Sequence, residues 1–569
     1  MTTRGWIEIA AFVLVMVVLV RPLGRYLWHV FERERPPAVR ALGWLERALL
    51  RGGGLVDARG QSAREYGGAV LAFGFVGVIV THALLRLQSL LPPDPGHAAV
   101  PPLLAFDTAV SFTTNTNWQA YAGESTMSYG AQMLALTWQN FVSAATGFGV
   151  MLAFARGLTR RADDDATVGN FWVDLVRALV YVLLPLSLAF ALVLVSQGVI
   201  QCFAPPLQLA TLEPGTQTIA LGPVASQEAI KLIGVNGGGF FNANSAHPFE
   251  NPTPLSDFLQ CVAILLLPAA LTHTYGCMTG NPRQGWVLLV AMTLLLLAGV
   301  AAVYAAEAAG NPAAALPGVA AGPNLEGKEV RFGLAGSALF ATITTDASCG
   351  AVNGMHDSFT PLGGLVLLLD IMLGEVVFGG VGVGLVGMLV LALLTVFVAG
   401  LMVGRTPEYL GKKIEPREMK LAMLYLLTVP LVLLVLAAIA AVGPWGTAPL
   451  GNAGPHGLSE ILYAYASASG NNGSAFAGLA ADTPFYDLTL ALAMLVGRFA
   501  LVVPVLAIAA SMRRKTPVPP GPGTLPTDGG SFLAVLLAVV LVVGALTFFP
   551  VLCLGPIVEH FTVAAGRFF

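Results

Sequence analysis

Hydrophobic and polar positions follow each other along this chain in long blocks, with apolar runs of about 20 residues or more separated by shorter polar segments. A helix of that length matches the hydrocarbon thickness of a bilayer. The runs predict ten transmembrane helices, near residues 7–29, 66–91, 127–156, 171–198, 255–279, 285–308, 362–402, 419–442, 483–511 and 531–555. We therefore expect an all-α membrane protein.

The seventh run is too long for one straight crossing. As a continuous helix, residues 362–402 would measure roughly 60 Å, about twice the hydrocarbon thickness. Glycines are dense at 374–384 and permit a sharp bend, so we expect one crossing that is interrupted in the middle and acts as a gate. Close glycine packing between helices is the alternative interpretation. The candidate gate residues here are Glu375, Gly379 and Gly380.

Four polar segments between the runs share one design: a short amphipathic helix, then a tight loop of small and amide residues, then the next apolar run. The helices are expected near 105–113, 226–234, 337–347 and 459–469. Irregular backbone at membrane depth is tolerated where it is buried in protein or lines a wet cavity. Four such loops around one axis would form a ring of backbone carbonyls, which can replace the hydration shell of potassium. The predicted filter residues are Thr114, Asn115, Thr116, Asn236, Gly237, Gly238, Cys349, Gly350, Ala351, Asn472, Gly473 and Ser474.

The eight inner spans pair around these loops as span, pore helix, filter loop, span, which predicts four pseudo-symmetric repeats in a single membrane domain of residues 1–569. The expected repeats are 66–156, 171–279, 285–404 and 419–511, flanked by 1–65 with the first span and by 531–569 with the last. In the first loop, Asn115 is predicted to stand where the other loops have glycine. Asparagine tolerates left-handed backbone better than most residues, so the symmetry is expected to be approximate.

Acidic residues near the predicted starts of three pore helices suit the positive end of the helix dipole. They are Asp107, Glu228 and Glu460, and Ser226 and Ser459 are predicted caps. The negative helix ends would then point toward the place where a cation sits. A site of neutral carbonyls favours a monovalent ion, because Ca²⁺ and Mg²⁺ usually recruit carboxylates.

Composition supports the membrane assignment, since 56% of the residues are hydrophobic and only 11% are charged, against about 25% charged in soluble domains. No basic patch is present, so nucleic acid is not an expected partner. The five scattered cysteines form neither a disulfide framework nor a metal motif. With the N-terminus outside, most of the 29 Lys and Arg fall in cytoplasmic loops, and all four filter loops lie outside.

Single polar residues within this frame have open roles. Arg498 lies within a span and could pair with Glu375, or it could place a positive charge under the filter and block axial escape of potassium. Lys231 is expected to be a structural tether to Glu228 or a carbonyl. Gln119 could hold the filter loop or reach its mouth. The role of Asp370 in the seventh span is not assigned by the sequence.

Five long motifs in order resemble the potassium-binding subunit family of the bacterial Kdp potassium-transporting ATPase, over essentially the full chain. They are Thr114–Gln119 (TNTNWQ), Gly234–Pro252 (GVNGGGFFNANSAHPFENP), Ser348–Val352 (SCGAV), Asn471–Gly478 (NNGSAFAG) and Arg405–Glu415 (RTPEYLGKKIE). The family is related to the Trk and Ktr pore subunits. The resemblance implies a potassium-selective subunit that takes potassium from outside and delivers it to a catalytic P-type ATPase subunit.

The resemblance also implies a small accessory subunit, a single-span peptide and lipids as partners, in the bacterial inner membrane. Tyr409, Lys412 and Lys413 are predicted partner contacts in the basic loop 405–418, although such a loop also follows from the positive-inside rule alone. No Asp-Lys-Thr-Gly-Thr or G-x-x-x-x-G-K-[ST] motif occurs, so ATP hydrolysis belongs to a partner. We expect no covalently bound cofactor, with potassium as the substrate held at the filter. An autonomous potassium channel or ion-coupled symporter is the alternative.

Overall fold

The structure is a computed structural model that describes residues 1–33, 39–55, 59–92, 96–162, 166–312, 322–402, 404, 406–519 and 524–567. Within these ranges ten helical spans are long and apolar enough to cross a membrane, as the sequence predicts. Several are continuous helices with a π-helical turn. The spans are α1 (Thr3–Glu32), α3 (Ala63–Arg86), α6–η2–α7 (Tyr129–Ala131, Gln132–Thr137, Trp138–Thr159), α8–η3–α9 (Phe171–Arg177, Ala178–Leu183, Leu184–Ser196), α11 (Pro254–Met278), α12 (Pro282–Ala309), α15 (Val383–Met402), α16 (Pro416–Val442), α19–η7–α20 (Pro484–Leu495, Val496–Ala500, Leu501–Arg513) and α21–η8–α22 (Gly530–Leu552, Cys553–Ile557, Val558–Ala564).

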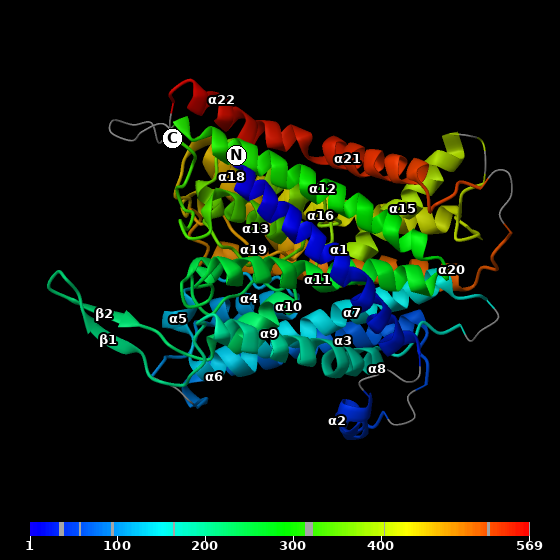
Figure 1. The fold of residues 1–569 in the computed structure, drawn as a ribbon, viewed down its shortest axis with the longest axis horizontal. Helices are drawn as coiled ribbons and strands as arrows, with labels where there is room; N and C mark the ends of the chain where they lie inside the picture. The colour runs from blue at the N-terminus through cyan, green and yellow to red at the C-terminus, as the bar shows by residue number, and fades with distance from the viewer. Residues whose placement is uncertain are drawn as a thin grey trace.

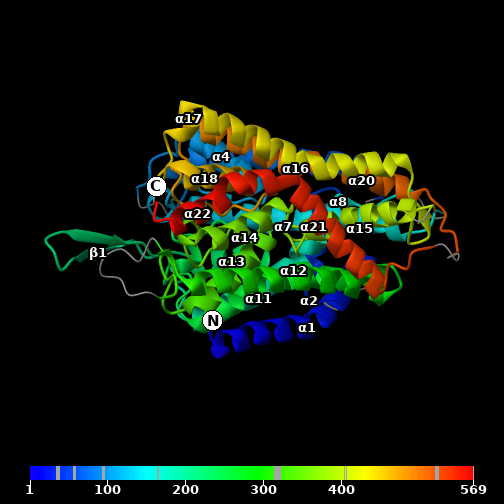
Figure 2. The ribbon, with the colours of Figure 1, turned by 90° about the horizontal axis from the view of Figure 1, so that it is seen from above.

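The spans lie side by side in one bundle, with both chain ends at the same end of it (Figures 1 and 2). An exposed hairpin of β1 (Leu207–Ala210) and β2 (Thr216–Ile219) projects from this end. We call it the filter end, because the four loops lie toward it. The opposite end carries α2 (Val39–Gly52), which packs against α8, and the small hairpin of β3 (Glu408–Tyr409) and β4 (Lys412–Lys413). The all-α prediction missed both hairpins, which are short.

Four pore helices stand between paired spans and each ends in a predicted filter loop. They are α4 (Pro102–Thr113), α10 (Val224–Ile233), α13 (Gly333–Asp346) and α18 (Gly454–Gly470). Short connecting elements complete this end: η1 (Gln88–Leu90), α5 (Gly123–Thr126), η4 (Asn244–Ala246), η6 (His356–Ser358) and α17 (Pro444–Thr447). The pore helices are almost entirely buried, so they lie inside the bundle, with the spans packed around them.

The predicted caps and first-turn acids of the pore helices are wrong. These helices begin two to five residues earlier than the sequence suggested, and α4 and α18 carry a proline at their start, where its missing N–H costs nothing. Asp107, Glu228 and Glu460 therefore lie inside their helices. Ser226 and Ser459 cap nothing; their hydroxyls donate to the carbonyls of Pro223 and Pro455.

The seventh span is interrupted, as the glycine density predicts. Helix α14 (Pro361–Met372) ends at residue 372 and α15 begins at residue 383, with non-helical backbone between them. Gly374, Glu375, Phe378, Gly379 and Gly382 have φ between 51° and 81°, the left-handed region that favours glycine. Five such residues in nine positions explain why no helix continues through this segment, which we call the break (residues 373–382).

Candidate ion-binding site

One backbone hydrogen bond recurs in all four loops and sets their register. In each loop, one backbone N–H just after the pore helix donates to the carbonyl of the residue five positions earlier. The pairs are Thr116 to Ser111 (3.0 Å), Asn236 to Lys231 (2.8 Å), Cys349 to Thr344 (3.1 Å) and Asn472 to Ser467 (2.8 Å). The residue just before each donor has positive φ: Asn115 (69°), Val235 (53°), Ser348 (55°) and Asn471 (61°). The four loops therefore repeat one backbone path.

This register corrects the predicted composition of the first loop. Asn117, with φ of 60°, occupies the position of Gly237, Gly350 and Gly473. The prediction that Asn115 stands there is wrong by two residues. The sequence misled because Asn115 lies three residues before Trp118, the same spacing that separates Gly237 from Phe240. The alternation Thr-Asn-Thr-Asn offers two asparagines, and only the backbone pattern distinguishes them.

Hydrogen bonds join each loop to the next and close a ring. Asn236 Nδ2 donates to Asn115 Oδ1 (2.7 Å), joining loops one and two. The Cys349 thiol donates to the Asn236 carbonyl (2.9 Å), joining loops two and three. Ser348 Oγ donates to the Asn471 carbonyl (3.1 Å), and Asn471 Nδ2 donates to Thr116 Oγ1 (2.9 Å), which returns to loop one. Buried amides and hydroxyls thus hold the four loops at fixed spacing.

The loop glycines lie where backbones meet. A Cβ on Gly350 would lie 2.8 Å from Gly237 Cα and 2.8 Å from the carbonyl carbon of Gly473. A Cβ on Gly473 would overlap the Thr116 carbonyl oxygen, and Gly473 also has φ of 99°. Gly237 and Gly350 lack positive φ, so close approach rather than torsion excludes side chains there. Backbone torsion by itself disfavours a side chain only at Gly473.

Gln119 clamps the first loop to the second. Its Nε2 donates to the Gly239 carbonyl and its Oε1 accepts from the Gly239 N–H, both at 3.1 Å. Of the two predicted roles, the structure shows the holding role. Gln119 also lines the vestibule described below.

Lys231 is the predicted structural tether and supports the second loop from behind. Its side chain is fully buried, and Nζ lies 2.7 Å from Glu228 Oε2 and 3.2 Å from Glu250 Oε2. Nζ also donates to Asn244 Oδ1 (2.7 Å), and Asn244 Nδ2 donates to the Gly237 carbonyl (2.7 Å). The charge is compensated by two carboxylates, and the chain of bonds ends on a filter residue.

A vestibule of about 1040 Å³ opens from the ring toward the filter end. Residues of all four loops line it: Asn117, Gly237, Gly350, Gly473 and Ser474, together with Gln119. Near its edge, His456 at the start of α18 lies between Glu559 on α22 (2.8 Å) and Asp357 on η6 (3.1 Å). Burial lowers the pKa of His456, but the hydrogen bonds and charges of the two carboxylates outweigh burial and raise it to about 10. A protonated His456 therefore ties three elements around the vestibule.

The break closes the opposite side of the ring. All residues from 375 to 382 are buried, and the Gly379 N–H donates to the carbonyl of Asp346 at the end of pore helix three (3.2 Å). A Cβ on Gly382 would lie 2.5 Å from the Gly147 carbonyl, and one on Gly379 would collide with Gly384. A small cavity of about 40 Å³ lies beside this contact, lined by Gly382, Tyr425 and Arg498 among others. The predicted interruption thus fills the space below the filter.

Arg498 lies in the π-helical turn η7, and its charged side chain lines the small cavity beside the break. Its Nη2 donates to the Ser143 carbonyl (2.9 Å), and Ser143 Oγ donates to Asn115 Oδ1 (2.7 Å). No ion pair joins Arg498 to Glu375, both of which the structure describes, so the predicted bridge is wrong. Glu375 instead lies against Gly470, where a Cβ would approach its carboxyl carbon to 3.3 Å. Asp370 accepts from Thr345 Oγ1 (3.2 Å), which fixes α14 to α13.

The predicted partner loop is largely committed to this chain. Tyr409 is buried and its hydroxyl lies 2.9 Å from that of Tyr275. Lys412 is 1% exposed and donates to the carbonyls of Gly157 (3.1 Å) and Arg160 (2.7 Å). The prediction that these two contact a partner is therefore corrected, because a lysine in a basic loop can equally cap a helix end. Lys413 is exposed, and Arg405 lies outside the described residues.

Comparison with known proteins adds a family to this geometry. Residues 10–561 match the family model described as potassium-transporting ATPase A subunit (KdpA). The potassium-transporting ATPase potassium-binding subunit of Methylorubrum extorquens is 58% identical over 570 residues, covering 100% of this chain and 99% of that protein. The subunit of the same name from Mesorhizobium japonicum is 54% identical, with 100% of both chains covered.

A solved structure shares the fold. The potassium transporter TrkH from Vibrio parahaemolyticus superimposes with a TM-score of 0.52, covering 88% of this chain and 97% of that one. At 16% sequence identity, this likeness speaks for the fold alone. It agrees with a mostly helical membrane bundle.

Proposed function

Because this chain belongs to the family of potassium-transporting ATPase A subunits, we propose that it is the potassium-binding, non-catalytic subunit of a potassium-transporting ATPase complex. It is a multi-pass membrane protein, with ten candidate spans among the residues that the structure describes. The observation that carries the proposal is the ring of four loops, which are joined by hydrogen bonds and line a vestibule. ATP hydrolysis belongs to a partner subunit.

In this proposal, potassium enters the vestibule hydrated and exchanges water for backbone carbonyls of the loops. Fixed spacing lets a ring of oxygens replace the hydration shell of one ion size, and the cross-loop hydrogen bonds supply that stiffness. The filter set follows the structural register, with Thr116, Asn117 and the glycines 237, 350 and 473 at its centre. Thr114 and Asn115 act from the turn before, as supports.

Axial escape is blocked by the break and by Arg498, so potassium leaves sideways toward the ATPase subunit. Like charges repel strongly in a low-dielectric site, and Arg498 is positioned directly beneath the loops through Ser143. Each repeat (66–156, 171–279, 285–404 and 419–511) supplies one quarter of the ring. We place the chain in the bacterial inner membrane with its N-terminus and filter loops outside, following the distribution of Lys and Arg.

Rubidium uptake into liposomes tests the proposal. The chain alone should bind potassium but give no sustained flux, whereas the assembled complex should transport rubidium only with ATP. Titrating potassium into the purified chain should show saturable binding that sodium does not displace. Selective flux from the chain alone, without ATP, would establish the channel alternative instead.

The partners are proposed to include the catalytic subunit, a small accessory subunit and a single-span peptide. Lys413 is an exposed basic residue through which loop 405–418 would meet the catalytic subunit. We expect Lys413→Glu to reduce potassium-stimulated ATPase activity of the complex several-fold, because it reverses one contact charge. Arg283→Glu, at another exposed position of the same end, is the matched control. Equal activity of both variants would leave loop 405–418 as a topology signal.

A further inference from the structure

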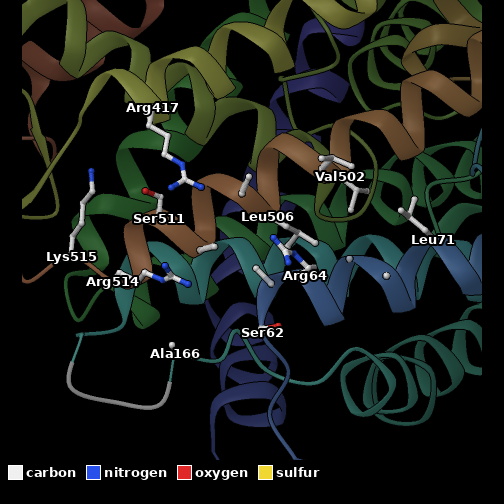
Figure 3. A pocket seen from close by; sticks show the side chains of 16 residues that line it. Ser62, Arg64, Leu71, Ala166, Arg417, Val502, Leu506, Ser511, Arg514 and Lys515 are labelled. Carbon is white, nitrogen blue, oxygen red and sulfur yellow. The ribbon is translucent and has the colours of Figure 1, made fainter.

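A second cavity lies at the opposite end of the bundle from the filter, between the start of α3, the start of α16 and the end of α20 (Figure 3). Its volume is about 920 Å³, comparable to the vestibule. Helix α3 belongs to the first predicted repeat and α20 to the fourth, so the cavity lies at the seam where the ring of repeats closes. The proposed function makes no use of it.

One wall of this cavity is apolar and runs along the membrane-spanning helices. Leu71 of α3 and Val502, Val503 and Leu506 of α20 line it. Val503 is 58% exposed and Leu71 is 40% exposed, so these side chains face the outside of the bundle. Gly68 leaves open space along this wall, since a Cβ there would meet nothing within 4 Å. Because this wall is apolar and runs along membrane-spanning helices, an acyl chain of a lipid can pack against it.

The rim of the cavity is basic. Figure 3 shows Arg64, Arg417 and Arg514 turning their guanidinium groups toward the same space. All three are exposed, and within the described part of the chain none has a side-chain hydrogen bond or ion pair. Lys515 differs, because Glu415 (3.1 Å) and Glu418 (2.8 Å) neutralise it. Three positive charges that no described acidic residue pairs with thus surround the mouth of an apolar groove.

We propose that this cavity is a specific site for an anionic phospholipid of the cytoplasmic leaflet. The phosphate lies among the three arginines, which suit bidentate binding of phosphate oxygens, and one acyl chain lies along the α3–α20 wall. A free phosphate would leave the wall uncovered, whereas a lipid satisfies both halves. The assignment to the cytoplasmic leaflet depends on the membrane orientation given in the proposed function, but the binding site itself does not.

Lipid binding to the delipidated full chain, measured by native mass spectrometry in detergent, tests this site. The probes are phosphatidylglycerol, phosphatidylcholine, glycerophosphoglycerol without acyl chains, and inorganic phosphate. We expect phosphatidylglycerol to bind at least about tenfold more tightly than phosphatidylcholine. The two soluble probes should neither bind measurably nor displace it at lipid-competitive concentrations.

Two variants address the two halves of the site. The triple variant Arg64→Gln, Arg417→Gln and Arg514→Gln should weaken phosphatidylglycerol binding on the order of 100-fold, since each basic residue beside an anionic lipid contributes about a factor of five. Gly68→Phe should fill the wall and weaken both lipids roughly tenfold. The control triple Arg47→Gln, Arg51→Gln and Arg283→Gln removes the same charge from exposed positions outside the cavity and should change binding less than about threefold.

Three outcomes would overturn the proposal. The first is phosphatidylglycerol binding that the arginine triple leaves unchanged, and the second is an equal loss in the control triple. The third is a partner chain, rather than lipid, captured by a photoreactive group at Gly68→Cys in the assembled complex. Rubidium uptake by the complex reports separately on the proposed function, so loss of lipid binding with intact uptake distinguishes the two proposals.

Discussion

The filter loops and the break are both irregular, glycine-containing backbone in the middle of the protein, yet they have opposite effects. The loops leave a vestibule of about 1040 Å³ on one side, whereas the cavities described beside the break measure about 20, 40 and 60 Å³. In the loops, side-chain amides and hydroxyls bond across to the next loop and hold the closely approaching backbones at fixed spacing. At the break, glycines let backbone contact backbone directly. Glycine therefore permits both shapes, and the neighbouring hydrogen-bonding side chains decide between them.

The largest expected effect comes from adding a methyl group to the ring. Gly473→Ala should lower potassium affinity roughly 100-fold, equivalent to about 3 kcal/mol, because its Cβ meets the Thr116 carbonyl and displaces two loops. Sodium and rubidium should then compete better. Potassium titration of the purified chain measures this.

Gly333→Ala is the matched control for that change. Gly333 also has positive φ (69°), but a Cβ there meets nothing within 4 Å. The control separates backbone strain from obstruction of the ring. Equal affinities of both variants and the unmodified chain would remove the filter assignment.

The next effect concerns the closed side. Arg498→Ala should produce ATP-independent potassium flux at least about tenfold above the unmodified chain, because it removes the repulsive charge beneath the loops. Flux into liposomes loaded with a potassium-sensitive dye measures the leak. Arg283→Ala, exposed and remote, should remain tight. If Arg498→Ala shows no increase in potassium flux, the break alone closes the route below the filter.

A smaller change tests the corrected register of loop one. Asn117→Gly keeps the left-handed backbone but loses the bond to Asn140 (2.6 Å) and those from Asn236 and Gly237, so potassium affinity should fall about three- to tenfold. Asn117→Val should fall further, since a β-branched residue at positive φ is strained. Asn242→Gly, exposed at the vestibule, should have no effect. Unchanged potassium affinity in both Asn117 variants would indicate Asn115, rather than Asn117, as the filter residue of loop one.

The smallest effect is a pH dependence at the vestibule edge. The folded-state pKa of His456 is raised to about 10 from 6.5, so its stabilising contribution is fully present below about pH 6.5 and is lost as pH rises through 10. The apparent Tm should therefore fall between pH 7 and 10, by roughly 1–3 °C more than in His456→Gln. Thermal unfolding by tryptophan fluorescence measures both. Parallel pH profiles would show that His456 carries no such charge.

The spans, the four loops and the break could be predicted because each depends on local properties. Apolar run length fixes a crossing, and a cluster of glycines such as Gly379 and Gly380 ends a helix wherever it occurs. The resemblance to a known family placed the function in the same way, through contiguous motifs. The length of the apolar runs alone predicted the ten spans that the described residues contain.

Other features depended on contacts between distant segments. Lys412 is buried because the carbonyls of Gly157 and Arg160 lie beside it, more than 250 residues away in sequence. Arg498 bonds to Ser143 rather than Glu375 for the same reason. The loop-one register required backbone hydrogen bonds, which residue spacing does not encode. A pattern can therefore nominate a residue, but its partner is set by tertiary packing.

The four loops come from one polypeptide, and this affects how the site can change. In a channel assembled from four identical subunits, one substitution alters every quarter of the ring together. Here a substitution alters one quarter, as Asn117 shows beside three glycines. Each quarter can therefore acquire its own neighbours, such as the Lys231 network behind loop two and the break beneath loop three. A pore gated on one side and supported on another can thus evolve, or be engineered, one quadrant at a time.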